Sequence, residues 1–519
     1  MQRRLFVFAC ILGMTLFLVT ALAGFASTGL AAPGTASTGP VATLPFSTFL
    51  GAPGTEEGFA IEVDDQGRVY VAGFTASTTF PTRTTASQQH GIDTFWSRLA
   101  PDGGSADFTE WVNAASLFAP DNAYDLAVDK QGAMVVTGDA SSSDFCSYFG
   151  AGIPGYDTSY NGNADAFVLK VKADGSGLEY CTFLGGNDVD VGRAISLAAD
   201  GSVWVSGSTW STDFPTTTLA ADPTHNGLRD SFLARLSADG TQLLYSSYLG
   251  GSGQEETRSM ALDSDGGPAL TGWTFSTDFP VTAQAAYTTA GGGADAFLAQ
   301  FDADGLIQGA SYLGGEDEDR GMALTFLPDG TLAVAGLTAS ANFPLTLDAI
   351  DSQLKGLHDA FLVRISPELE HIRFSTLLGG AGDDRALGMA ADSIGTLVLT
   401  GQTTSSDWPR TPDAGDSNLD GPSDAFLLRL HAGGVGSLPG MARILYSSYL
   451  GGSLEDRGSA IAIAGEDTIV LTGGTRSTDF PTTAGALDES HNGEHDVFIT
   501  AVKLPPPVPK YQTWLPYMR

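Results

Sequence analysis

A short sequence unit recurs seven times along the 519 residues of this chain, and this repetition constrains the fold more than any other feature. The clearest copy is YSSYLGGSGQEETRSMALDSDGGPALTGWTFSTDFP, at residues 245–280. It contains an aromatic run ending in Leu-Gly-Gly, an acidic loop, two apolar runs joined by an Asp/Gly turn, and Ser-Thr-Asp-Phe-Pro. Such repeats indicate one supersecondary unit that must stack against its neighbours to bury its apolar faces.

The tripeptide Asp-(Ala/Ser)-Phe marks the period of the repeat. It begins at Asp165, Asp230, Asp295, Asp359 and Asp424, at spacings of 64 or 65 residues. Weaker copies begin at Asp93 and Asp496, each 72 residues from its neighbour. The extra residues are inserts at about 146–163 and 431–441. The repeat therefore occupies about residues 43–503.

Each copy contains four strand-length runs of apolar, aromatic and β-branched residues. In the fourth copy they lie at about 243–249, 259–263, 269–274 and 296–301. A short Asp/Gly turn joins the second run to the third, and glycine there can adopt the positive φ of a tight antiparallel hairpin. Seven such units predict an all-β fold: a seven-bladed β-propeller of four-stranded antiparallel blades.

The two ends of the repeat region predict how the ring closes. The region begins with an unpaired aromatic run at 46–50 and stops after 497–502 with no further aromatic run. The last blade therefore lacks an outer strand, and the N-terminal part has one to spare. We predict that the N-terminal strand pairs with the last blade, because this removes two open sheet edges.

The repeat resembles that of the bacterial seven-bladed β-propeller (SBBP) repeat family. The matching motifs are FSTLLGG at 374–380, DD at 383–384, DWP at 407–409 and DAF at 424–426. The first and second copies depart most, with Gly51-Ala52 in place of Gly-Gly and Phe145-Cys146 in place of Phe-Pro. The resemblance covers about residues 45–503. It implies a propeller in an exported, surface-associated setting and no settled activity.

The segments outside the repeats predict export. Arg3 and Arg4 precede an apolar run that ends near Ala23, which is typical of a signal peptide over residues 1–23. The run is also long enough to remain as an uncleaved membrane anchor. Residues 24–42 indicate a flexible spacer, and 504–519 form a Pro-rich, aromatic tail that serves as a docking tag or packs on the ring. We expect a secreted or cell-surface protein with no membrane span after cleavage.

The net charge limits the classes of partner, and the cysteines offer one possible disulfide. The net charge is −35, from 60 acidic against 25 basic residues, so we expect no nucleic-acid partner and a soluble monomer. Cys146 and Cys181 are the two cysteines beyond the predicted signal. They form either one bridge, as an exported protein allows, or two small buried apolar side chains, and the second interpretation is favoured.

The acidic loop is the best candidate for chemistry. Alignment of the copies places an acid at one equivalent position in all seven: Glu56, Asp121, Asp190, Glu255, Asp319, Asp384 and Asp456. This loop and the Ser-Thr-Asp-Phe-Pro loop are expected on one face, so the acids would ring one mouth of the axial channel. Such a mouth would bind a ligand or concentrate cations, and carboxylate oxygens suit Ca²⁺.

A structural interpretation of these acids competes with the functional one. Each acid would cap its own loop by accepting backbone N–H bonds, or would pair with a following arginine such as Arg320, Arg385 or Arg457. Recurrence in every blade favours this interpretation, because a repeated residue usually serves the repeated structure. No resident cofactor or metal site is predicted, although Ca²⁺ binding stays open.

These observations favour a non-enzymatic binding or structural scaffold at the cell envelope, with a surface protein or glycan as partner. The aromatics of the insert at about 146–163 would supply contact anchors: Tyr148, Phe149, Tyr156 and Tyr160. The alternative is a hydrolase or lyase that cleaves extracellular glycan at the acidic mouth, since paired carboxylates can cleave glycosides. Catalysis needs groups in unequal environments, and evenly repeated acids argue against it.

Overall fold

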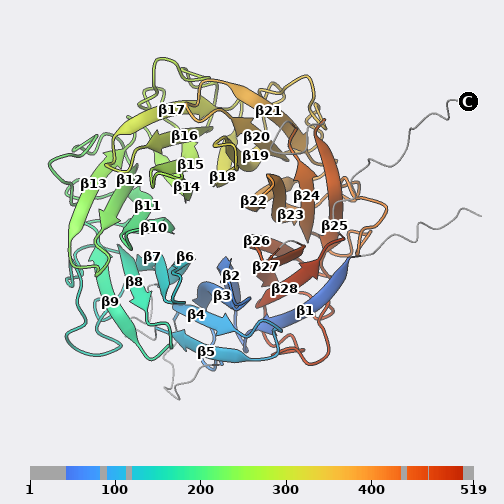
Figure 1. Cartoon of the computed structure of the whole chain (residues 1–519), viewed down its shortest axis with the longest axis horizontal. Helices are drawn as coiled ribbons and strands as arrows, with labels where there is room; N and C mark the ends of the chain where they lie inside the picture. Colours follow the sequence, from blue (N-terminus) through green and yellow to red (C-terminus); the bar gives the residue numbers. More distant parts are fainter. Residues whose placement is uncertain (1–41, 82–90, 113–119, 434–440, 466, 506–519) are drawn as a thin grey trace, which may run out of the picture. The chain divides into compact units, whose positions relative to one another are not determined.

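The computed structural model describes residues 42–81, 91–112, 120–433, 441–465 and 467–505. Within these ranges 28 β-strands form seven four-stranded antiparallel sheets, without a helix. The sheets are the blades of a β-propeller, arranged as a ring around a central axis (Figure 1). The predicted fold class is confirmed. The predicted signal peptide, the spacer up to residue 41 and the tail from residue 506 lie outside the described residues.

Each blade runs outward from the axis along the chain. Blades 1 and 2 are β2 (Glu56–Val63), β3 (Val69–Thr75), β4 (Asp93–Leu99), β5 (Ala106–Trp111) and β6 (Asn122–Val128), β7 (Met134–Ala140), β8 (Asp165–Val171), β9 (Leu178–Leu184). Blades 3 and 4 are β10 (Asp190–Leu197), β11 (Val203–Thr209), β12 (Asp230–Leu236), β13 (Leu243–Leu249) and β14 (Glu255–Leu262), β15 (Pro268–Thr274), β16 (Asp295–Phe301), β17 (Ile307–Leu313). Blades 5 and 6 are β18 (Asp319–Phe326), β19 (Leu332–Thr338), β20 (Asp359–Ile365), β21 (Ile372–Leu378) and β22 (Asp384–Ala391), β23 (Thr396–Thr403), β24 (Asp424–His431), β25 (Arg443–Leu450). Blade 7 is β26 (Asp456–Ile463), β27 (Thr468–Thr475), β28 (Asp496–Lys503) and β1 (Thr43–Leu50).

Blade 7 closes the ring with a strand from the other end of the chain. β1 pairs antiparallel with β28, with Phe46 opposite Ala501 and Leu50 opposite Val497. Ser47 strengthens the junction, because its hydroxyl donates to the carbonyl of Pro481 at 2.6 Å. The predicted pairing of the N-terminal strand with the last blade is confirmed.

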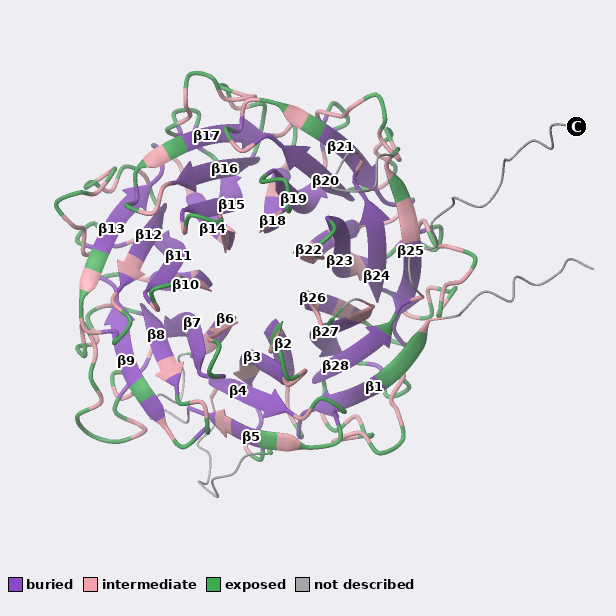
Figure 2. Ribbon diagram, in the orientation of Figure 1, coloured by how far each residue is buried: buried purple, intermediate pink, exposed green. Residues whose placement is uncertain are grey.

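The apolar core lies between neighbouring blades. Figure 2 shows that the second and third strands of each blade are almost wholly buried. Between blades 2 and 3, one cluster joins Val168 and Leu184 of blade 2 to Val203 of blade 3. Phe214, from a Ser-Thr-Asp-Phe-Pro loop, stacks in this cluster on Phe232 with ring centroids 4.6 Å apart. This loop aromatic therefore packs between two blades.

A disulfide joins Cys146 to Cys181, with the two Cα atoms 5.4 Å apart. The favoured interpretation of two free buried thiols is therefore wrong. The reason is the insert of blade 2, which folds back over the blade. Phe145 packs against Phe167 with ring centroids 4.5 Å apart, and this brings the neighbouring Cys146 against β9, where Cys181 lies.

The aromatics of the same insert mostly pack on the ring. Phe149 lies 5.5 Å from the ring of Trp96, Tyr160 lies 5.9 Å from that of Phe183, and Tyr148 packs against the same core cluster. Tyr156, 39% exposed, stays available as a contact anchor. Among the described residues, no helix is long and apolar enough to cross a membrane.

Candidate functional site

The seven repeated acids stand at the start of the innermost strand of each blade and are all buried. None is more than 1% exposed: Glu56, Asp121, Asp190, Glu255, Asp319, Asp384 and Asp456. Their side chains therefore do not form an open carboxylate ring at the mouth. Within the described residues, no hydrogen bond or ion pair joins one of the seven to another.

Each acid accepts hydrogen bonds from its own loops. Asp384 accepts from the backbone N–H of Gly380 at 2.7 Å, from the hydroxyl of Ser405 at 2.7 Å, and from the hydroxyl of Thr403. The serine donor recurs at Asp190, Asp319 and Asp456, at 2.8 to 2.9 Å. A carboxylate with two or three such donors ties the acidic loop to the Ser-Thr-Asp-Phe-Pro loop, as the structural interpretation predicts.

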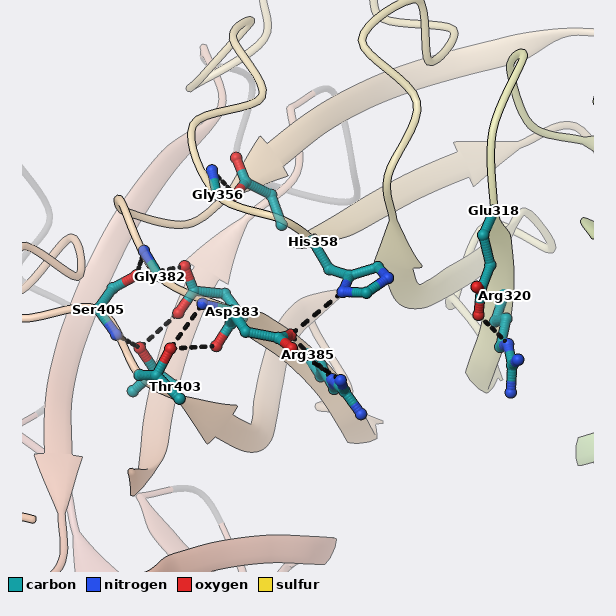
Figure 3. A network of polar contacts seen from close by, with 12 residues as sticks. Glu318, Arg320, Gly356, His358, Gly382, Asp383, Arg385, Thr403 and Ser405 are labelled. Carbon is teal, nitrogen blue, oxygen red and sulfur yellow. Dashed lines mark hydrogen bonds and ion pairs between the residues drawn. The ribbon is translucent and has the colours of Figure 1, made fainter. Parts of the chain in front are cut away.

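The following arginines do not pair with these acids. Arg320 pairs with Glu318 at 2.6 Å, and Arg385 pairs with Asp383 at 2.7 Å (Figure 3). Arg457 reaches across the ring closure to Glu57 of blade 1. The repeated acids therefore accept hydrogen bonds from uncharged donors, and the arginines that follow them pair with other carboxylates.

A second carboxylate lies near each repeated acid, across the junction between two blades. It is the aspartate that opens the third strand of the preceding blade. The pairs are Asp496/Glu56, Asp93/Asp121, Asp165/Asp190, Asp230/Glu255, Asp295/Asp319, Asp359/Asp384 and Asp424/Asp456. At the junction of blades 2 and 3, both carboxylates pack on Gly185, where a Cβ would lie 2.7 Å from an oxygen of each. Glycine is required there because no side chain fits between them.

Burial and the paired carboxylate shift the pKa of these groups upward. Burial raises the pKa of Glu56 to about 8 and that of Asp190 to about 7, with the charge of the paired aspartate adding to the effect. The pKa of Asp93 rises to about 8 for the same two reasons. The folded ring therefore holds protons that the unfolded chain would release.

This shift predicts a ring that is more stable in mild acid than in mild base. The folded state binds more protons than the unfolded chain between about pH 4 and pH 8, so the free energy of unfolding falls as pH rises through that window. Calorimetric melting temperatures at pH 5 and pH 8 test this, with the higher value expected at pH 5. Glu56→Gln removes one titrating group and should flatten the dependence. Equal melting temperatures at the two pH values would contradict the prediction.

A β-bulge in every innermost strand turns one side chain toward the axis. In β10 the pairing with β11 skips Arg193, and in β14 the pairing with β15 skips Arg258. The same shift recurs three residues after the repeated acid in the other blades. Bulges redirect side chains in this way next to functional sites. The bulged residues are Phe59, Tyr124, Arg193, Arg258, Met322, Leu387 and Ser459.

All seven bulged residues line a central cavity of about 500 Å³. The residues two positions further along each strand border the cavity but pack mainly in the cores between blades, and all are apolar: Ile61, Leu126, Ile195, Met260, Leu324, Met389 and Ile461. The apolar positions are alike in every blade, whereas the bulged ring differs in residue type from blade to blade. It carries two arginines and two aromatics on the side of blades 1 to 4, and Met, Leu and Ser on the other side.

The arginines of the bulged ring share one carboxylate. Arg258 Nε lies 2.9 Å from Glu256 Oε1, and Arg193 Nε lies 3.6 Å from the same atom. Arg229 Nη1 lies 2.8 Å from Glu256 Oε2. The guanidinium of Arg193 also lies 3.9 Å from the ring centroid of Tyr124. Three cations around one buried carboxylate leave this side of the cavity positively charged.

Tryptophan rings pack against the arginine cluster. The guanidinium of Arg229 lies 4.8 Å from the ring centroid of Trp210 and 4.5 Å from that of Trp273. The guanidinium of Arg320 lies 5.1 Å from the ring centroid of Trp273. These cation–π contacts orient the guanidinium groups without neutralising them.

Two carboxylates also line the cavity, Glu62 and Asp125. Asp125 accepts the backbone N–H of Ile195 in the next blade at 2.8 Å. Ser259 Oγ accepts the equivalent bond from the backbone N–H of Leu324 at 3.1 Å. The same link between blades therefore recurs with a different side chain. Burial, with the nearby charge of Glu62, raises the pKa of Asp125 to about 7.

In the described part of the chain, no group of three or more His, Cys, Asp or Glu side chains could hold a metal ion. The carboxylates at the blade junctions come in pairs, and some of their buried oxygens, among them Asp165 Oδ1 and Asp190 Oδ1, have no hydrogen-bond partner. Ca²⁺ needs about six to eight oxygen ligands. One pair of carboxylates supplies at most four of these oxygens.

The arrangement of Arg193, Arg258 and Glu256 was not predicted from the sequence. A signal was present: the position three residues after the repeated acid carries six residue types in the seven copies, whereas the positions beside it are mostly small residues. Strand alternation alone does not reveal the bulge that turns this position toward the axis. Arg229 comes from the start of a third strand and meets Glu256 only across a blade junction.

Comparison with known proteins finds only distant structural likenesses. No family model matches the chain, and no curated protein matches it. Among solved structures, a quinohemoprotein alcohol dehydrogenase from Comamonas testosteroni is similar at a TM-score of 0.42 and 9% identity, over 91% of this chain and 78% of that one. BamB from Moraxella catarrhalis is similar at 0.36 and 13%, over 86% and 85%. The endosialidase of phage phi92 is similar at 0.39 and 10%, over 91% and 70%. Likenesses this distant do not carry an argument about function.

Proposed function

We propose that this propeller is an exported, non-enzymatic binding scaffold of the cell envelope, and that its axial cavity is the ligand site. The resemblance of the repeat to the SBBP family supports the setting. Surface protein and glycan are the partner classes that we propose for the outer rim, where Tyr156 is exposed. The protein would act as a monomer.

One observation carries the proposal: the repeated acids are used in building the blades, whereas the cavity-facing residues vary. Seven equivalent carboxylates, buried and bonded to loop donors, do not offer the unequal acid and base that hydrolysis needs. The cavity of about 500 Å³ has the volume of a small-molecule site, and Arg193, Arg258 and Glu62 are among the polar residues in its wall.

The Cys146–Cys181 bridge supports export, because disulfides persist in oxidising compartments. It joins residues 35 positions apart. It also holds the insert against blade 2, so that the rim on this side is rigid. A rigid rim and a fixed cavity suit binding with little loss of conformational freedom.

The alternative is a glycan hydrolase or lyase, and one pair of residues favours it. Glu62 and Asp125 both line the cavity, and Asp125 has a raised pKa beside Glu62. A carboxyl group with a raised pKa beside a second carboxylate is the arrangement that general acid catalysis uses. Against it, Asp125 already accepts two backbone N–H groups, from Leu126 and Ile195.

A turnover assay distinguishes the two functions. The wild-type chain and Glu62→Gln are incubated with a panel of acidic and neutral polysaccharides, and new reducing ends and unsaturated uronates are measured. Glu316→Gln, an exposed glutamate in a mouth loop, is the matched control. We expect no turnover by any of the three proteins. Turnover that Glu62→Gln abolishes and Glu316→Gln retains would overturn the proposal in favour of the enzyme.

A further inference from the structure

The junction between blades 6 and 7 is built differently from the others. At four junctions, the turn between the third and fourth strands of one blade packs on an aromatic ring in the outer strand of the preceding blade. A Cβ at the turn glycine would overlap that ring, so the backbone of the turn lies directly on it. The pairs are Gly103 on Phe46, Gly175 on Phe108, Gly240 on Tyr180 and Gly305 on Tyr245. At a fifth junction Gly309 stands in place of the aromatic residue, and the side chain of Leu369 packs there instead.

Ring closure removes this turn at the junction of blades 6 and 7. β28 ends at Lys503, and its outer neighbour β1 begins at Thr43, at the other end of the described chain. No turn therefore joins these two strands over Tyr446, the equivalent aromatic residue of blade 6. Instead, Ala42 and Leu504 from the two strand ends pack in the same core cluster as Tyr446.

A groove of about 420 Å³ lies at this junction, between the neighbouring outer strands β25 and β1 (Figure 1). Its walls include Leu44, Tyr446 and Val502. Leu44 is 37% exposed, and the accessible surface of the groove is mainly apolar. Three carboxylates also line it: Asp416, Asp420 and Asp479. The groove therefore combines apolar surface with negative charge.

The sequence that follows the described chain has a matching composition. Residues 506–519, PPVPKYQTWLPYMR, contain three aromatic residues, two cations (Lys510 and Arg519) and no acid. This composition is unusual in a chain with 60 acidic and 25 basic residues. Residues 26–41, which precede β1, contain no charged and no aromatic side chain, so they match the groove less well.

The same segment begins beside the groove. Val502 lines the groove, Leu504 is buried in the adjacent cluster, and the described residues end at Pro505. Residues 506–519 span at most about 46–50 Å when extended. β25 has 8 residues and is about 26 Å long. The segment is therefore long enough to follow the groove from end to end.

We propose that residues 506–519 fold back into the groove between β25 and β1, with aromatic side chains against Leu44 and with Lys510 and Arg519 beside the three aspartates. Because the segment is tethered next to the groove, its effective concentration there is high and weak contacts suffice. Docking takes the place of the missing turn and fastens β1 to blade 6. Outer strands form this groove and innermost strands line the axial cavity, so the docking is independent of the ligand site proposed above.

Calorimetric titration tests the proposal with the peptide PPVPKYQTWLPYMR and two proteins, the full chain and a chain shortened to end at Pro505. The peptide is expected to bind the shortened chain saturably and to raise its melting temperature. It is expected to bind the full chain at least tenfold more weakly, because the protein's own segment already occupies the groove. Equal affinity for the two proteins, or no saturable binding to the shortened chain, would overturn the proposal.

A substitution in the full chain locates the docking, and it stays decisive if the shortened chain does not fold. Trypsin cleavage after Lys510 is followed by mass spectrometry. Leu44→Asp places a charge in the apolar wall and is expected to speed this cleavage at least tenfold. The matched control is Leu244→Asp, at a leucine that is 47% exposed on the outer strand β13 of blade 3, and it should leave the rate unchanged. Equal rates in the two variants would contradict docking in this groove.

Two further measurements distinguish the occupant and the role of charge. The shortened chain is expected to stay monomeric in size-exclusion chromatography. A dimer of the shortened chain that Leu44→Asp separates would assign the groove to a second copy and overturn the proposal. Raising the salt concentration to about 0.5 M is expected to weaken peptide binding at least threefold, because ions screen the attraction between the cations and the aspartates. Binding that is independent of salt would overturn the role of the three aspartates.

Discussion

Deletion of residues 43–50 is expected to lower the free energy of unfolding by at least about 5 kcal/mol. The deletion removes β1, which buries Phe46, Phe49 and Leu50 at 3% exposure or less. Burial of one such side chain contributes about 1.5–3 kcal/mol. The loss also exposes the backbone edge of β28, and an open edge of this kind pairs with other chains. We therefore expect self-association in size-exclusion chromatography, beside a lower midpoint in urea unfolding.

A peptide of sequence TLPFSTFL provides the control. If β1 acts by closing the ring, the free peptide should restore much of the lost stability when added to the deleted chain. The same peptide with Phe49 replaced by aspartate should not, because Phe49 contacts Phe480 in the core of the last blade. A deleted chain that stays monomeric and as stable as the full chain would contradict the ring closure.

Gly336→Ala is expected to cost about 3 kcal/mol or more, although it adds one methyl group. A Cβ at Gly336 would overlap the carbonyl oxygen of Arg320 and lie 2.9 Å from the ring of Phe361. That carbonyl projects toward β19 because the bulge at Met322 shifts the register of β18. The backbone would have to move at the bulge, and overpacking of this kind is strongly destabilising.

The matched control is Gly293→Ala, in a loop where the nearest atom to the new Cβ is 3.7 Å away and φ is not positive. We expect this change to stay within about 0.5 kcal/mol of the parent. Urea unfolding of the two variants measures both values. Similar stabilities of Gly336→Ala and Gly293→Ala would show that the bulge tolerates a side chain and would contradict the account of its geometry.

Most of the fold could be predicted because each local signal was repeated seven times. The Asp-(Ala/Ser)-Phe spacing, the Asp/Gly turns and the unpaired run at 46–50 agree with one architecture, and the ring closure follows from counting strands. The disulfide was not predicted, because Cys146 and Cys181 come close only when Phe145 packs in the core and folds the insert back. That contact depends on tertiary packing and leaves no local pattern.

The cavity could be predicted less well, for a physical reason. Acids such as Asp384 were candidate site residues because they repeat. In the structure they are buried and accept hydrogen bonds from loop residues elsewhere in the same repeat. The residues that face the cavity do not repeat, and they reach the axis through a bulge that strand alternation conceals. Arg229 and Glu256 meet across a junction between blades. In a repeat protein of this kind, the positions that vary between copies are the better guide to a site.

This division of roles is tested most directly by one pair of variants, Asp384→Ala and Arg193→Met. Urea unfolding is measured on both. Asp384→Ala leaves Gly380 N–H and the Ser405 hydroxyl without their acceptor, so it should lower the free energy of unfolding by about 2–4 kcal/mol. Arg193→Met, at a position that differs between blades, should stay within about 1 kcal/mol of the parent in stability. The opposite pattern, with stability kept in Asp384→Ala and lost in Arg193→Met, would contradict the account.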